Sequence, residues 1–271
     1  MGIVQKQSIK SSAYIYIGFI IGAINILFLF KQYLTPEQFG LTRLLVDVST
    51  LLAMLCTLGS CPATIKFFPF YQSYLPPKKN ELPFLTIVVC LIAVLTPLFK
   101  ELIIRKFGQR SSLFLEYFYF IYPLTIFFAL WYLLESIEWS LQNTVLTNFL
   151  KEVGFRLLTS IFILLYAFKI IKFNHFIWLF SSLYILPVCI LFIDLYKKNY
   201  FHFTFTISKV TRRLYKHLLT FSLFIFSGQL LGLIARTSDT IIISSQSTNG
   251  LADTAVFTVA TFLIALMEVP M

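Results

Sequence analysis

Charged side chains are scarce in this sequence. Asp, Glu, Lys and Arg make up only 13% of its 271 residues, against roughly 25% in an ordinary soluble domain. Hydrophobic residues make up 58%, and the mean hydropathy is +0.82. These values exclude an ordinary soluble domain and predict an all-α, polytopic membrane helix bundle.

Acidic residues are the scarcer of the two charged classes. The chain has 12 Asp and Glu against 22 Lys and Arg, which gives a formal net charge of +10. In a membrane protein such an excess typically comes from cytoplasmic loops rich in Lys and Arg. We therefore expect no nucleic-acid partner.

The residues that build catalytic and metal centres are also few. The chain has three histidines without HxxxH or HxxxD partners, and it has no CxxC, no phosphate-binding glycine loop and no nucleophile elbow. The four cysteines lie in or beside apolar segments without metal-ligand spacing: Cys56, Cys61, Cys90 and Cys189. We expect no enzyme activity, no catalytic residue, no cofactor and no metal.

Long apolar runs are abundant by contrast. A membrane-spanning helix needs about 20 predominantly apolar residues, and the sequence predicts about eight of them. Their approximate ranges are 12–34, 41–64, 82–99, 117–137, 153–168, 175–195, 218–243 and 251–271. The amphipathic segment 138–152 is expected to run on into the fifth helix, the sixth is broken in character at Pro187, and 197–216 is expected to be a solvated linker.

The beginning of the chain recurs after a shift of 210 residues. The matching pairs are Gly18 with Gly228, Gly22 with Gly232, Gly40 with Gly250 and Leu41 with Leu251. An internal repeat predicts an N-terminal six-helix bundle at 1–215 and the first two helices of an incomplete C-terminal bundle at 216–271. The alternative is two unrelated helices that share packing glycines.

The end of the sequence bears on the same prediction. Glu268-Val-Pro-Met ends an apolar helix without a polar tail, and the second copy of the repeat covers only some 60 residues beyond the 210-residue shift. We therefore expect a truncated or partial sequence, missing roughly four or more helices.

Polar residues inside the apolar segments mark the expected substrate path. Arg236 and Asp239 lie within the seventh segment, where an ionised group costs at least about 2.5 kcal/mol. The two can neutralise one another at i and i+3, or they can line a cavity. Asn25, Arg43 and Gln229 complete the candidate set.

Several of these polar residues can instead have a purely structural role. Asn25 can form a hydrogen bond between helices, and Arg43 can pair with Asp47 at i and i+4. Glu135 and Glu138 lie beside tryptophans, which favours a solvated helix end with aromatic anchors over a functional site.

Short motifs resemble one family of transporters. They are Gly18-x6-Asn25 in the first helix, Leu34-Thr-Pro-Glu-Gln-Phe-Gly40, Ala235-Arg-Thr-Ser-Asp239-Thr-Ile-Ile-Ile, Gly250 and Val269-Pro270. In helix order and in these motifs the chain resembles the polysaccharide biosynthesis proteins, the Wzx-type O-antigen flippases of the MOP (MATE-like) exporter superfamily.

The resemblance implies the first half of a MATE-like fold plus the start of the second, around a central cavity. It implies that alternating access flips a lipid-linked oligosaccharide, a lipopolysaccharide precursor, across the bacterial cytoplasmic membrane, with membrane lipids as further partners. It would place Asn25, Arg236 and Asp239 near the cavity. Coupling to a proton or sodium gradient through Asp239 is a further hypothesis.

Two other functions are compatible with the sequence, and its basic residues predict an orientation in the membrane. The alternatives are a MATE-type small-molecule exporter and a membrane-embedded transferase or ligase of envelope sugars. The basic residues near helix ends favour a cytoplasmic N-terminus, although the basic segment 100–110 argues against it.

Overall fold

The computed structural model describes residues 3–74, 112–198 and 209–268, and over these ranges the chain is helical without strands. Within these ranges, five helical stretches are long and apolar enough to cross a membrane. They are Gln7–Tyr33, Pro36–Thr57, Phe118–Ser140, Phe173–Lys197 and Arg212–Gln246. These stretches indicate a multi-pass membrane protein. The predicted third helix, 82–99, lies outside the described residues.

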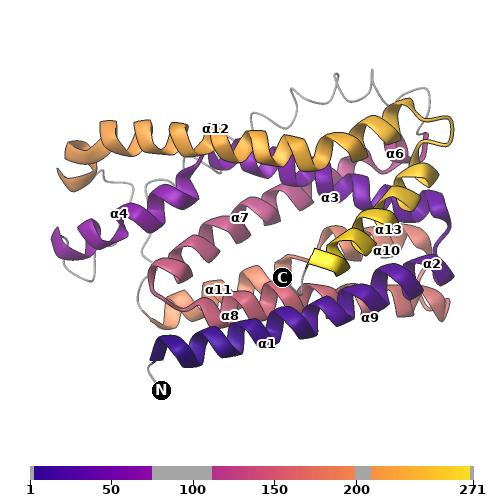
Figure 1. Cartoon of the computed structure of the whole chain (residues 1–271), viewed down its shortest axis with the longest axis horizontal. Coiled ribbons are helices and arrows are strands. Elements are labelled where there is room, and N and C mark those ends of the chain that lie inside the picture. Colours follow the sequence, from indigo (N-terminus) through magenta and orange to yellow (C-terminus); the bar gives the residue numbers. More distant parts are fainter. Residues whose placement is uncertain (1–2, 75–111, 199–208, 269–271) are drawn as a thin grey trace.

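The helices follow one another along the chain with few breaks (Figure 1). Their bounds are α1 Ile3–Ala23, η1 Ile24–Leu29, α2 Phe30–Tyr33, α3 Pro36–Thr57, α4 Ser60–Tyr74, α6 Ser112–Glu116, η2 Phe118–Phe120, α7 Ile121–Ser140, α8 Thr144–Asn148, η3 Phe149–Gly154, α9 Phe155–Ala167, α10 Phe173–Ser181, α11 Ile185–Lys197, α12 Lys209–Gln246 and α13 Leu251–Glu268.

Helix α3 forms the centre of the bundle. It packs against α7, and also against α12 and α13, while α4 packs against both α7 and α12. Leu41, Leu44 and Leu45 on α3 are fully buried in the main hydrophobic cluster. Because α3 is covered by three helices, it positions α7 and α12 as neighbouring walls.

Helix α1 forms a second packing unit with the segment from α8 to α9. The two run side by side along one edge of the bundle (Figure 1). A β-carbon at Gly18 would overlap the backbone carbonyl of Glu152, and one at Gly22 would lie 3.3 Å from the Arg156 side chain. Small residues thus allow close helix approach here, as in other membrane interfaces.

The second helix begins and ends earlier than predicted. It starts at Pro36 rather than Leu41, because Thr35 caps it in a capping box with Gln38 and Pro36 occupies the first turn. It stops at Thr57, since Leu58 and Gly59 adopt positive φ values of 45° and 71°. The chain then continues as α4.

Other boundaries also differ from the prediction. The sixth helix breaks at 182–184 rather than at Pro187, because Pro187 lies in the first turn of α11, where a proline is tolerated. Helix α12 begins at Lys209, inside the segment expected to be a linker. The prediction that 138–152 runs on into the fifth helix is correct only from Thr144, where α8, η3 and α9 are continuous to Ala167, because residues 138–140 belong to α7 and the chain turns at 141–143.

Candidate functional site

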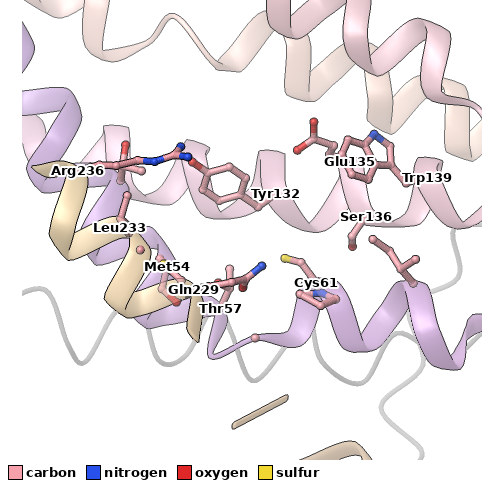
Figure 2. A pocket seen from close by; sticks show the side chains of 15 residues that line it. Met54, Thr57, Cys61, Tyr132, Glu135, Ser136, Trp139, Gln229, Leu233 and Arg236 are labelled. Carbon is pink, nitrogen blue, oxygen red and sulfur yellow. Dashed lines mark hydrogen bonds between the residues drawn. The ribbon is translucent and has the colours of Figure 1, made fainter. Parts of the chain in front are cut away.

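A cavity of about 480 Å³ lies between α3, α4, α7 and α12. Its size falls within the range of roughly 300–1,000 Å³ usual for small-molecule sites. Figure 2 shows side chains from these helices directed toward it. The helices α12, α7 and α3 contribute different chemistry to its walls.

The wall from α12 carries two of the predicted site residues. Gln229, Gly232, Leu233 and Arg236 line the cavity, and their spacing of i, i+3, i+4 and i+7 places them on one helical face. Figure 2 shows the Arg236 side chain reaching toward Tyr132 of α7. The sequence-predicted pair of Gln229 and Arg236 is therefore brought to one surface.

The wall from α7 repeats the same spacing. Tyr132, Glu135, Ser136 and Trp139 line the cavity from this helix. Glu135 is 7% exposed, and its Oε1 lies 3.3 Å from the Nζ of Lys151 on η3. This wall combines a buried carboxylate with two aromatic rings.

Hydroxyl groups on α3, which forms a further wall of the cavity, are already bonded within their own helix. Thr50 donates to the carbonyl of Val46 at 2.7 Å, and Thr57 donates to that of Met54 at 3.0 Å. By contrast, neither the Gln229 amide nor the Arg236 guanidinium has a hydrogen bond or ion pair within the described residues. These two groups remain available to a ligand.

Asn25 lies away from this cavity, in the interface between η1 and α9. It is 3% exposed; its Nδ2 donates to the carbonyl of Arg156 at 2.8 Å, and its Oδ1 accepts from Ser160 Oγ at 2.6 Å. The side chain therefore joins two helices, as the alternative interpretation of the sequence had it.

Arg43 and Asp239 do not line the cavity. Arg43 pairs with buried Asp47, with Nε and Oδ2 separated by 3.1 Å. Asp239 is exposed on α12, and it forms no salt bridge with Arg236 in the part of the chain that the structure describes. Local neutralisation of Arg236 by Asp239 is thus not observed.

The structure corrects the interpretation of Glu135 and Glu138. Their sequence context favoured a solvated helix end, but both side chains are buried. The reason is tertiary: η3 covers Glu135, and the end of α11 covers Glu138 through Lys198. The only signal in the sequence was two acids on one face of α7, which does not reveal what covers that face.

Comparisons with known proteins identify no relative. No family model matches the chain, and no curated protein and no solved structure matches it either. The family resemblance therefore rests on the short sequence motifs alone.

Proposed function

We propose that the protein is a membrane carrier that flips a lipid-linked oligosaccharide across the cytoplasmic membrane by alternating access. One observation carries the proposal: Arg236 lines a cavity between apolar helices without a partner among the described residues. An arginine within a membrane segment normally faces protein, water or a polar ligand. An anionic ligand would supply the missing partner.

The chemistry of the cavity suits the three parts of such a substrate. A diphosphate would bind the Arg236 guanidinium, which can form two parallel hydrogen bonds to phosphate oxygens. The Gln229 amide and the rings of Tyr132 and Trp139 would contact sugar hydroxyls and sugar faces. The exposed apolar flank of α12, where Leu231 is 70% exposed, would lie beside the lipid tail.

The second candidate is an exporter of small molecules, the MATE-type alternative. The cavity volume favours it, because about 480 Å³ accommodates a compact ligand without a lipid tail. The two candidates differ in where the substrate travels. A flippase moves a head group while its tail stays in the bilayer, whereas an exporter moves the whole molecule between two aqueous phases.

The test is a flipping assay on the full chain reconstituted in liposomes. The probe is a fluorescent isoprenyl-diphosphate sugar, and protection from a membrane-impermeant quencher reports its leaflet. Arg236→Gln should reduce the flipping rate about tenfold or more, because a hydrogen bond to a charged group contributes roughly 1.5–3 kcal/mol. Arg213 and Arg236 are both exposed on α12, but Arg213 does not line the cavity, so Arg213→Gln should flip at the wild-type rate.

The outcomes separate the candidates. Equal rates in wild-type liposomes and in liposomes without protein would contradict the flippase. Export of a soluble dye without flipping of the lipid probe would favour the small-molecule exporter. An equal loss in Arg236→Gln and Arg213→Gln would show that the effect comes from general charge rather than from the cavity.

A further inference from the structure

Two buried carboxyl groups follow one another along α7. Glu135 and Glu138 are three positions apart, at i and i+3, so they lie on the same side of the helix. Glu135 is 7% exposed and lines the cavity, whereas Glu138 is 0% exposed and lies one turn further toward the end of α7. Buried acids are rare unless paired, so two in succession on one apolar helix require an explanation.

Among the described residues, Glu135 has one ion-pair partner, Lys151 of η3. Lys151 Nζ lies 3.3 Å from one carboxylate oxygen, and the lysine side chain is itself 42% exposed. Lys151 also lies 5.9 Å above the centre of the Trp139 ring. A proton on Glu135 would remove the negative charge and release Lys151 from this contact.

Only one of the two carboxylate oxygens of Glu138 accepts hydrogen bonds from the described residues. Its Oε2 accepts hydrogen bonds from Asn143 Nδ2 at 2.7 Å and from Lys198 Nζ at 3.2 Å. Its Oε1 is buried and has no hydrogen-bond partner among the described residues. A buried oxygen without a partner is costly for an ionised carboxylate, and it is a place where a proton can be held.

A polar route leads from Glu138 to the surface. Lys198 also contacts Asp194 near the end of α11, and Asn143 Nδ2 lies 3.3 Å from an Asp194 oxygen. Asp194 is half-buried and Lys198 is exposed. Glu138 therefore lies between a charged group at the end of the bundle and the carboxyl group in the cavity.

The charged and titratable groups around the two acids and their cavity come from six parts of the fold. They are Lys151 and Glu152 on η3, Cys61 on α4, Tyr132 on α7, Tyr184 before α11, Arg236 on α12, and Asp194 and Lys198 at the end of α11. The cations among them stabilise the ionised carboxylates, and burial opposes them.

We propose that Glu135 is a proton-binding site of the cavity and that Glu138 relays the proton to it from the end of the bundle that carries Asp194 and Lys198. A proton leaves water at that end and binds a Glu138 oxygen. It then passes to Glu135, so that Glu138 is again ionised and Glu135 is neutral. The proton leaves through the cavity when Glu135 regains its contact with Lys151.

The role of this site would be to couple transport to a proton gradient, and that role rests on the proposed carrier function. The binding of a proton at Glu135 does not depend on that function. Glu135, which lines the cavity, thus takes the coupling role that the sequence suggested for Asp239, which does not line it.

The test follows the emission of Trp139 in the purified full chain, without any substrate. Release of Lys151 should change this emission as Glu135 takes up a proton when the pH is lowered. Trp139→Phe assigns the signal, and Glu135→Gln should abolish it. Glu37→Gln removes an exposed acid at the start of α3 and should leave the titration unchanged.

The relay is tested by the rate of the same signal after a pH jump. Glu138→Gln should slow the change at least about tenfold, the lower range of what a positioned proton-transfer group contributes, and it should leave the final amplitude intact. Glu135→Asp keeps an acid in the cavity and should retain a titration, which guards against a folding defect in Glu135→Gln.

Each result has a defined consequence. A wild-type emission without a titration, or a titration that survives in Glu135→Gln, would overturn the site. A normal rate in Glu138→Gln would overturn the relay. If the titration is present but the liposomes flip nothing, the proton site stands and the proposed function fails.

Discussion

Gly40 on α3 lies directly against the backbone of Leu251 on α13, so that a β-carbon at Gly40 would overlap the Leu251 carbonyl oxygen. Leu251 is the repeat counterpart of Leu41, the residue that follows Gly40. The two helices therefore meet close to where the predicted repeat pairs Gly40 with Gly250 and Leu41 with Leu251. The repeat itself stays a prediction.

The first helix of each repeat packs differently. Gly18 and Gly22 on α1 lie against η3 and α9, whereas their counterparts Gly228 and Gly232 meet nothing within 4 Å among the described residues. Gly228 and Gly232 on α12 thus lack, among the described residues, the close neighbour that Gly18 and Gly22 have on α1. This difference provides matched controls for mutation.

The first prediction concerns Gly40. Gly40→Ala should destabilise the protein by about 1–3 kcal/mol, because overpacking forces neighbouring backbone to shift. Gly228→Ala makes the same chemical change at an open position and should be neutral or slightly stabilising. Thermal unfolding in detergent, followed by size-exclusion chromatography, measures both. Equal stability of the two variants would contradict the close contact.

The second prediction concerns Asn25. Asn25→Ala removes two hydrogen bonds between η1 and α9 and should lower stability by about 0.6–1.7 kcal/mol, the range measured for such bonds in membranes. Binding of the lipid-linked probe should stay unchanged at temperatures where the variant is folded. A loss of binding with normal stability would instead restore Asn25 to the substrate path.

The third prediction concerns Arg43 and Asp47. Arg43→Ala leaves the buried Asp47 carboxylate without its cation and should destabilise the protein by about 1–3 kcal/mol. The double variant with Asp47→Ala as well should recover part of this loss, because it removes the unpaired charge. Thermal unfolding of the single and double variants forms a double-mutant cycle. Additive losses would show that the pair is not coupled.

The fourth prediction distinguishes cavity from lipid on the two sides of α12. In a background without native cysteines, Gln229→Cys should react rapidly with a water-soluble maleimide, because Gln229 lines the cavity. Leu231→Cys lies on the exposed apolar flank and should react slowly in liposomes, since the hydrocarbon region excludes the reagent. Gel-shift labelling measures both rates. Similar rates would show that the cavity is not open to water.

Sequence reasoning located most of the helices, because apolar length is a strong local signal. It failed at boundaries governed by local chemistry, as at Thr35 and Gln38, whose capping box starts α3 one turn early. It also placed the break of the sixth helix at Pro187, although a proline in a first turn does not interrupt a helix. These errors concern where helices begin and end. The sequence also did not predict α4 as a helix of its own, and the predicted helix 82–99 lies outside the described residues.

The candidate site was only partly visible in the sequence. Gln229 and Arg236 were found, because polar groups stand out in an apolar run and share one helical face. Glu135 was assigned to a solvated end, because nothing near it in the sequence shows that η3 brings Lys151 over it. Asn25 looked similar to Arg236 in sequence, yet it is bonded to α9 far from the cavity.

The sequence by itself determined that this chain is helical and built for a membrane, because scarce charge and long apolar runs are properties of composition and length. Only the tertiary structure decided which polar residues share a cavity and which merely join helices. The physical reason is that a side chain's role depends on what covers it, and the covering helices come from distant parts of the chain.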